Sequence, residues 1–371
     1  MSGMNRREFG HAIAAAGAIP FLQPSQSPAD AGSLTNVPGL KVGHFTDTRR
    51  PTGCTAIIFD SPAAAGVDYD GSAPGESQMA MLQPVSPVER IHALFLTGGG
   101  VLALPSAAGV LRYCEERKIG FDWGNPNLRI PIVVSAVIDD LSVGDNLIRP
   151  DAEAAYKACT AASTAQVAEG NVGAGAGATV GKMHRGRGLG GMKGGIGSAS
   201  LTLGDVVIGA LAVVNAAGDI LDPRTGSILA GARRPDGSFA DSAAVMREIV
   251  SSQPAKGPLG MLRASPALED DALRSTTLGV VATNVAFNKT ALTKIAMMAN
   301  CGASRAVRPY HTTGDGDQMY AISTGSLVRS DIPLTAIGSL AADVIAEAIA
   351  RAVRAASSIP DWPGLRDAQR R

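Results

Sequence analysis

The sequence has few aromatic residues, no excess of charge of either sign and no long apolar run. Aromatic residues make up 4% of its 371 residues, whereas 44 residues are glycine, a composition that favours closely packed layers and many tight turns. Lysine and arginine together number 33, as do aspartate and glutamate, so the sequence shows no electrostatic footprint for nucleic acid or for an anionic membrane. No apolar run reaches the roughly 18–20 residues of a membrane span. These absences predict a globular protein that neither binds nucleic acid nor spans a membrane.

The sequence also lacks the spacing patterns of metal, disulfide and phosphate sites. Its four cysteines include no C-x-x-C pair, and its five histidines include no H-E-x-x-H motif. The glycine-rich segment 98–103 follows an expected strand, but no acidic residue stands at the tip of a second strand to hold a ribose. The segment that ends in Gly181-Lys182 lacks the first glycine of the P-loop pattern and the hydroxyl residue after the lysine. We therefore expect neither a cofactor nor a metal.

The first 31 residues have the order of regions of an export signal. The pair Arg6-Arg7 precedes Phe9, and a weakly apolar run follows over residues 11–22. The arginine pair resembles the twin-arginine type, and residues 29–31 form a small-x-small cleavage site. The sequence predicts a signal peptide over 1–31 and a periplasmic or secreted protein, and the other interpretation is an unstructured start. Because twin-arginine export carries folded proteins, we expect the four cysteines to be buried thiols: Cys54, Cys114, Cys159 and Cys301.

From residue 40 onward, apolar strand-like runs alternate with alanine-rich helical stretches. Helices do not separate every pair of strands, so this order predicts packed sheet and helix layers instead of a doubly wound sheet. Strands are expected at 54–59, 92–96, 132–137, around 201, and at 206–215, 276–284 and 317–324. Helices are expected at 105–117, 151–162, 289–300 and 340–355. Residues 222–271, rich in Pro, Gly, Ser and charge, predict a mobile surface connection.

Ser275-Thr276-Thr277 forms the junction between that connection and a buried strand. The three hydroxyl residues directly abut an apolar run rich in β-branched residues. A threonine hydroxyl at such a junction can attack the carbonyl before it and leave a new chain that starts with threonine. The freed α-amine, with a pKa of about 7.7–8.0, can activate the adjacent hydroxyl near neutral pH. The other interpretation is a Ser/Thr-rich strand start with local turn hydrogen bonds.

Six separated motifs occur in order along the chain. They are 38–44 (PGLKVGH), 52–55 (TGCT), 96–99 (LTGG), 170–175 (GNVGAG), 276–277 with 282–284, and 311–312 with 315–317. Together they resemble the DmpA-type aminopeptidases, a family that includes β-peptidyl aminopeptidases and nylon-oligomer hydrolases. The resemblance implies an α/β/β/α sandwich and self-cleavage of one domain, 32–371, into a large chain, 32–275, and a small chain, 276–371. It also implies assembly of the cleaved pairs into homo-oligomers.

The resemblance assigns roles to five residues. It makes Thr276 the nucleophile, and Asn215 matches the side-chain amide that hydrogen-bonds the developing oxyanion. Lys182 matches a lysine beside the nucleophile in the nylon-oligomer branch, where a cation can depress the pKa of the amine or hydroxyl. Asp315 and Asp317 match an acidic pair that orients the nucleophile. Without the resemblance, Asn215 would be interpreted as a turn residue, Lys182 as a solvated loop lysine, and the two aspartates as part of a turn.

Two positions depart from the family pattern. Asp139 stands where some relatives have a tyrosine that helps to hold the oxyanion, and an ionised carboxylate cannot donate a hydrogen bond. Ser275, which would supply the scissile carbonyl, stands where relatives often have Asn or Gly. The implied function is release of N-terminal residues from small peptides or amides through a threonine acyl-enzyme that water resolves. An acyltransferase of the ornithine acetyltransferase type and a binding protein that does not process itself are the alternatives.

Overall fold

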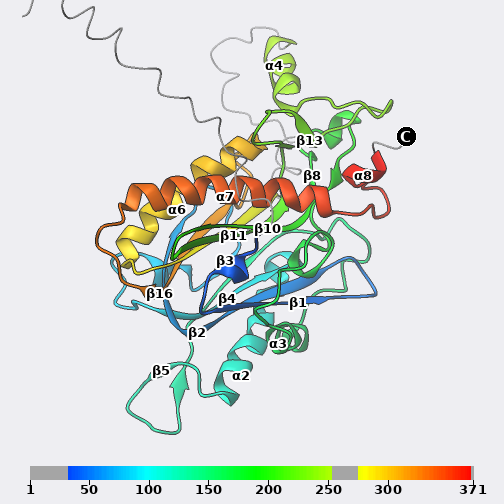
Figure 1. The fold of residues 1–371 in the computed structure, drawn as a ribbon. Coiled ribbons are helices and arrows are strands. Elements are labelled where there is room, and N and C mark those ends of the chain that lie inside the picture. The colour runs from blue at the N-terminus through cyan, green and yellow to red at the C-terminus, as the bar shows by residue number, and fades with distance from the viewer. Residues whose placement is uncertain (1–31, 253–274, 369–371) are drawn as a thin grey trace, which may run out of the picture.

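One long strand, β2 (Gly53–Asp68), pairs with strands of two different layers, called the first and the second sheet. The computed structural model describes residues 32–252 and 275–368, so the predicted signal peptide, 1–31, lies outside the described residues. The first half of β2 pairs with β1 (Leu40–Thr46) and β4 (Ile91–Thr97), and its last residues pair with β16 (Gln318–Leu327). Between the halves, residues 60–62 are exposed and the register shifts. The strand therefore passes from one sheet to the other at this point (Figure 1).

The first sheet carries helices on its outer face. Beyond β4 it continues with β7 (Val133–Val137), which runs parallel to β4, and with the short β3 (Glu76–Ser77). The helices α2 (Ala108–Glu116) and α3 (Ala152–Thr160) cover this sheet through a cluster of apolar side chains and buried cysteines. A hairpin, β5 (Phe121–Asp122) with β6 (Arg129–Ile130), projects beyond α2 (Figure 1).

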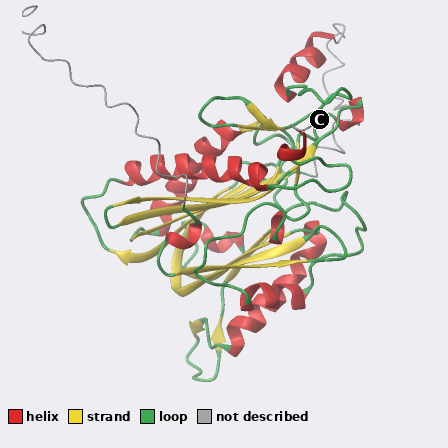
Figure 2. Ribbon diagram, turned by 45° about the vertical axis from the view of Figure 1, so that its right-hand side comes forward, coloured by secondary structure: helices red, strands yellow, loops and turns green. Residues whose placement is uncertain are grey.

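The second sheet contains the strand that begins at Thr276. Its order is β10 (Gly195–Leu203), β11 (Val206–Asn215), β14 (Thr276–Val285) and β16, with β14 antiparallel to β11 and parallel to β16. The helices α6 (Lys289–Ala306) and α7 (Leu334–Ala355) cover its outer face. Figure 2 shows the resulting four layers, with helices outside and two sheets between them. The predicted α/β/β/α sandwich is confirmed.

Alternation along the strands decides which side chains enter the space between the sheets. On β14, Leu278 and Val280 lie in the apolar cluster between the sheets, whereas Val281 lies in the cluster beneath α6 and α7. Successive side chains of a strand point to opposite faces, so Thr276 shares the inner face with Leu278. By the same alternation, Asn215 shares the inner face with Val213 of β11. Both polar side chains therefore lie at one end of the space between the two sheets.

A small lobe lies beyond this end of the sandwich, and it corrects the expectation that 222–271 is an irregular connection. The segment contains β13 (Ile228–Ala230) and α4 (Ser242–Ser252), and residues 253–271 lie outside the described residues. Ala232, Ala240 and Val245 form an apolar cluster that anchors α4, which explains why this polar segment is folded. The other elements here are β8 (Thr179–Val180), β9 (Met192–Lys193), β12 (Asp219–Leu221), β15 (Val307–Arg308) and α8 (Leu365–Ala368).

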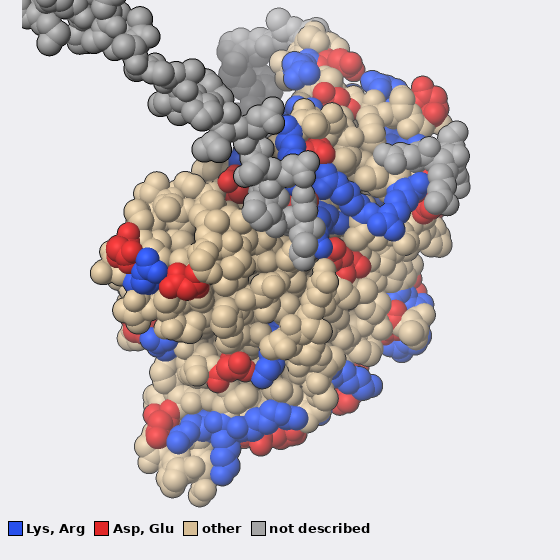
Figure 3. Space-filling view, viewed as in Figure 1, with Lys and Arg blue, Asp and Glu red and all other residues tan. Residues whose placement is uncertain are grey.

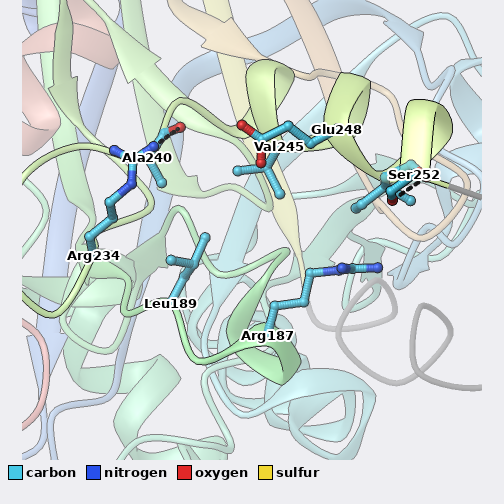
Figure 4. Close-up of a pocket in the computed structure, with 8 residues that line it drawn as sticks. Arg187, Leu189, Arg234, Ala240, Val245, Glu248 and Ser252 are labelled. Atoms are coloured by element: carbon cyan, nitrogen blue, oxygen red, sulfur yellow. Dashed lines mark hydrogen bonds between the residues drawn. The ribbon is translucent and has the colours of Figure 1, made fainter.

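The small lobe has its own pocket, which is separate from the predicted site. Its volume is about 360 Å³. Leu189 and Val245 form its apolar wall, and Arg187, Arg234 and Glu248 stand at its rim (Figure 4). None of the five predicted site residues lines this pocket.

The surface carries charged side chains of both signs. On the face shown in Figure 3, lysine and arginine side chains alternate with acidic ones around α2 and around the small lobe. Within the described residues, no helix is long and apolar enough to cross a membrane.

Cys54, Cys114 and Cys159 are buried thiols, but Cys301 is exposed on α6, so the expectation of four buried cysteines is wrong there. Cys301 lies on the outer side of the helix, away from the residues that pack against the sheet.

Candidate active site

Thr276 is the first residue of β14, and the neighbouring strands bring two predicted site residues to it. Asn215, the last residue of β11, lies directly opposite Thr276 in the antiparallel register. Asp317 lies immediately before β16, which pairs with β14 on its other side. Thr276 is only 6% exposed and Asn215 is completely buried. The ends of three adjacent strands therefore create one buried polar site at the edge of an apolar core.

The side-chain amide of Asn215 has a fixed orientation. Its Oδ1 accepts hydrogen bonds from Lys182 Nζ at 2.7 Å and from the backbone N–H of Thr179 at 2.9 Å. Its Nδ2 donates to the backbone carbonyl of Asp139 at 3.0 Å. Because the backbone N–H of Thr179 can only donate, the oxygen of the amide must face Thr179, and with it Lys182. These contacts turn the nitrogen of Asn215 towards the Asp139 carbonyl.

Lys182 is buried, and its electrostatic surroundings are those of a site residue. Burial lowers the pKa of Lys182 to about 7, and the charges of Asp139 and Asp315 oppose that shift. These two carboxylates act on Lys182 although they come from loops beside different sheets. The structure thus brings Lys182 together with Asn215 and Asp315, and the interpretation of Lys182 as a solvated loop lysine is wrong.

Asp315 and Asp317 occupy different positions around the strand start. Asp317 Oδ1 accepts from the backbone N–H of Thr277 at 2.5 Å, and its Oδ2 accepts from the N–H of His311 at 3.1 Å. Asp315 Oδ2 accepts from the N–H of Thr312 at 2.9 Å, while its buried Oδ1 has no hydrogen-bond partner within the described residues. Burial, followed by the charge of Asp317, raises the pKa of Asp315 to about 6. Asp317 thus holds the backbone, and Asp315 offers an open acceptor.

The peptide group before Thr276 is held by contacts of its own. The hydroxyl of Thr276 donates to the carbonyl oxygen of Ser275 at 2.7 Å. An ideal Cβ placed on Gly316 would lie 2.8 Å from Thr276 Oγ1, which puts Gly316 directly against the hydroxyl. Two residues that the sequence did not single out, Thr179 and Gly316, therefore belong to the site. A glycine between two aspartates was the only signal for Gly316, and nothing in the sequence pointed to Thr179.

Comparison with known proteins assigns the chain to one family. The family model of peptidase family S58 matches residues 32–365. This chain belongs to peptidase family S58. An uncharacterised aminopeptidase of Mycobacterium tuberculosis is 36% identical over 358 residues, covering 90% of this chain and 97% of that protein. A 6-aminohexanoate-oligomer endohydrolase of Kocuria is 28% identical over 343 residues, covering 90% of this chain and 89% of that protein.

Solved structures show the same fold. The L-aminopeptidase D-Ala-esterase/amidase of Ochrobactrum anthropi, a variant of the Ntn hydrolase fold, matches with a TM-score of 0.65 at 19% identity, covering 94% of each chain. A β-aminopeptidase of Burkholderia matches with a TM-score of 0.63 at 21% identity, covering 93% of this chain and 95% of that chain. This S58 member is accordingly a hydrolase of peptide or amide bonds with a fold of the Ntn hydrolase type.

In this S58 chain, a buried ion pair holds the loop that meets Asn215. Arg50 and Asp140 are both buried, with 2.8 Å between Arg50 Nη2 and Asp140 Oδ1. Asp140 also accepts from Thr52 Oγ1 at 2.7 Å and from the N–H of Gly99 at 2.9 Å. Burial raises the pKa of Asp140, and the Arg50 guanidinium opposes that shift. The pair therefore fixes the position of the neighbouring Asp139 carbonyl. It is this carbonyl, not the carboxylate considered in the sequence, that contacts the Asn215 amide.

The glycine-rich segments form part of the framework of this S58 site, and their backbone groups are engaged. The N–H of Gly173 donates to Thr46 Oγ1 at 2.8 Å, and that of Ala174 donates to Thr55 Oγ1 at 3.1 Å. Lys193, which is completely buried, donates to the carbonyls of Gly175 and Ala178 at 2.9 Å each. The turn 173–178 leads directly to Thr179 and thus to Asn215. These contacts position the turn as a support of the site.

Proposed function

We propose that the chain cleaves itself between Ser275 and Thr276 and then acts as an aminopeptidase with Thr276 as its N-terminal nucleophile. The observation that carries the proposal is the register of β11 and β14, which places the amide of Asn215 opposite a buried threonine at a strand start. The family supports a hydrolase. The proposal is further supported by a buried threonine, the Asn215 amide, a lysine of lowered pKa and a carboxylate of raised pKa at one end of the space between the sheets.

The proposed hydrolysis uses Thr276, Asn215 and Lys182 at stated atoms, while ionised Asp315 orients the nucleophile. Thr276 Oγ attacks the substrate carbonyl, while the α-amine of Thr276 takes the hydroxyl proton and passes it to the leaving amine. Asn215 Nδ2 donates to the oxyanion. Lys182 keeps the amide in this orientation. Water then hydrolyses the ester on Thr276 Oγ and restores the free hydroxyl.

The proposed substrates are small peptides or linear amides with a free amino group. The related proteins are named as aminopeptidases or as 6-aminohexanoate-oligomer endohydrolases, and both names describe cleavage of amide bonds. We further propose that the large and small chains stay together after cleavage, because β11 of one and β14 of the other are adjacent strands in a single sheet. Assembly of such pairs into homo-oligomers is part of the same proposal.

The direct test is the covalent state of the purified protein. Under denaturing conditions it should separate into two chains, one ending at Ser275 and one beginning at Thr276, and Edman sequencing of the smaller chain should start Thr-Thr-Leu-Gly. A purified, folded protein that remains one uncut chain would contradict the proposal.

The pH dependence of hydrolysis should show an inflection from Asp315. Its pKa is raised to about 6, so the ionised form that can accept a proton is lost as the pH falls through about 6 instead of about 4. We expect kcat/KM for an alanine p-nitroanilide to fall as the Thr276 α-amine gains a proton, at about pH 7.7–8.0, and to fall more steeply below about pH 6, where Asp315 is protonated as well. The control is Asp315→Asn, whose residual activity should lack the lower inflection. An unchanged inflection in that variant would assign it to another group.

Localisation is a separate proposal that rests on the sequence alone. The pair Arg6-Arg7 before a weakly apolar run favours export by the twin-arginine route. Replacing both arginines with lysine keeps the positive charge and should leave the protein in the cytoplasmic fraction. If the double-lysine variant still reaches the periplasm in normal amount, the twin-arginine interpretation is wrong.

A further inference from the structure

The carbonyl oxygen of Ser275, which belongs to the bond proposed for self-cleavage, has two hydrogen-bond donors. The backbone N–H of Gly316 donates to it at 2.9 Å, and the hydroxyl of Thr276 donates to it at 2.7 Å. Ser275 is almost completely buried and forms a parallel bridge with Asp315. The scissile carbonyl is therefore polarised by an N–H from the β16 side of Thr276.

This donor differs from the one proposed for substrate hydrolysis. Asn215 approaches Thr276 from β11, and its Nδ2 donates to the Asp139 carbonyl. Gly316 approaches from the opposite neighbour, since it precedes β16. Thr276 thus has a donor group on each side. In self-cleavage the hydroxyl attacks the carbonyl of the preceding residue, Ser275, and in hydrolysis it attacks the carbonyl of a substrate. The negative charge therefore develops on a different oxygen atom in each reaction.

The peptide group between Asp315 and Gly316 is held from both ends. Its carbonyl accepts from the backbone N–H of Ala73 at 2.9 Å, and its N–H donates to Ser275. A Cβ on Gly316 would lie 2.6 Å from the Ala73 carbonyl oxygen and 2.8 Å from Thr276 Oγ1, so only glycine fits in this gap. Hydrogen bonds in such a chain strengthen one another in a buried site. The Gly316 N–H is consequently fixed in place before any reaction begins, as an oxyanion donor must be.

We propose that the backbone N–H of Gly316 is the oxyanion donor for self-cleavage, whereas Asn215 serves substrate hydrolysis. The inference rests on the proposed function. Thr276 Oγ bonds to the Ser275 carbonyl carbon, and the carbonyl electron pair moves to the oxygen that faces Gly316. The C–N bond then breaks, the hydroxyl proton ends on the nitrogen, and Ser275 is left as an ester of Thr276 Oγ. Water hydrolyses this ester to the Ser275 carboxyl group and a free Thr276 hydroxyl.

A hydrogen bond in a strand bridge is common, so the test must measure the reaction and not the fold alone. Cell-free translation with glycolic acid at position 316 replaces the N–H by an ester oxygen and adds no side chain. We expect the full chain to split about 10²–10³ times more slowly than the unmodified chain, the usual effect of losing one oxyanion donor. The matched control is glycolic acid at Gly226, whose N–H donates to Asp222 in an exposed turn, and this chain should split at the normal rate.

The outcomes separate the two proposals. If the unmodified chain splits and the position-316 ester splits equally fast, the assignment of Gly316 is wrong while self-cleavage stands. If the unmodified chain never splits, the proposed function fails, and this inference fails with it.

A second variant keeps the inference testable if the ester at position 316 prevents folding. Ala73 lies in a half-buried loop, and Ala73→Pro removes the N–H that holds the Asp315 carbonyl without altering the core. We expect its half-time of splitting to lengthen about fivefold, the effect of one lost hydrogen bond, whereas Ala73→Ser, which keeps the N–H, should split normally. Equal half-times for Ala73→Pro and the unchanged protein would overturn the assignment.

Discussion

Thr276→Ala should yield a single uncut chain with no measurable hydrolase activity. The side chain at this position is proposed both to cut the chain and to attack the substrate, so its loss removes both reactions together. Loss of a catalytic hydroxyl nucleophile costs on the order of 10⁶-fold in kcat. Intact mass and hydrolysis of an alanine p-nitroanilide measure the two effects on the same sample.

Two neighbouring substitutions serve as controls for Thr276→Ala. Thr276→Ser keeps a hydroxyl and should retain part of both reactions. Thr277→Ala removes the adjacent hydroxyl, whose side chain points to the α7 side of the sheet by strand alternation, and should still split. The backbone N–H of Thr277, which holds Asp317, is unchanged by this substitution. If Thr277→Ala were the uncut protein and Thr276→Ala were cut, the nucleophile would be misplaced by one residue.

The layered fold follows from sequence periodicity to a large extent, because most buried strands are short apolar runs. The expected strand 206–215 coincides with β11, and the expected strand 276–284 differs from β14 by one residue. The second half of β2 was missed, because residues 60–62 form an exposed Asp-Ser-Pro sequence that resembles a turn. In the structure the strand continues through it, since pairing with β16 on the far side stabilises the extended backbone.

Helix boundaries were predicted less well than helix positions. The last helix was expected from residue 340, whereas α7 begins at Leu334 directly after Pro333. Gly338 discourages a helix by intrinsic propensity, but it lies against Met298 of α6, whose flexible end a Cβ would displace. Packing between α6 and α7 therefore outweighs the low helix propensity of glycine. The sequence alone does not show which residues of the two helices pack together.

Apart from Thr276, which the junction between connection and strand also indicated, the candidate site was predicted only through family resemblance, and its physical contacts explain why. Asn215 and Lys182 are 33 residues apart in the chain, yet their side chains meet at 2.7 Å. Such a contact depends on how β11 and the loop after β8 fold together, which no local pattern encodes. Gly316 was noticed only as the residue between two aspartates, although its backbone N–H lies against the proposed scissile carbonyl. The type of a residue does not show which hydrogen bond its backbone N–H makes, so sequence analysis misses such donors.

Asn215→Asp should lower kcat for amide hydrolysis by about 10²–10³-fold, the usual effect of removing one oxyanion donor. Aspartate has the shape of asparagine and keeps an oxygen for Lys182 Nζ and for the Thr179 N–H, but it lacks the Nδ2 donor. Asn215→Ala removes both functions, leaves the buried Lys182 without its nearest acceptor and should also lower the melting temperature. Comparing the two variants therefore separates the donor from the structural contact.

The kinetic pattern of Asn215→Asp distinguishes transition-state stabilisation from substrate binding. An oxyanion forms only in the reaction, so kcat and kcat/KM should fall together while KM changes little. The contacts through Oδ1 are preserved in this variant, but its second carboxylate oxygen replaces Nδ2 opposite the Asp139 carbonyl. Its melting temperature should therefore fall as well, and kcat is to be measured at a temperature at which the variant is folded. Normal kcat in Asn215→Asp would show that the amide nitrogen is not the donor and that Asn215 acts only by holding Lys182.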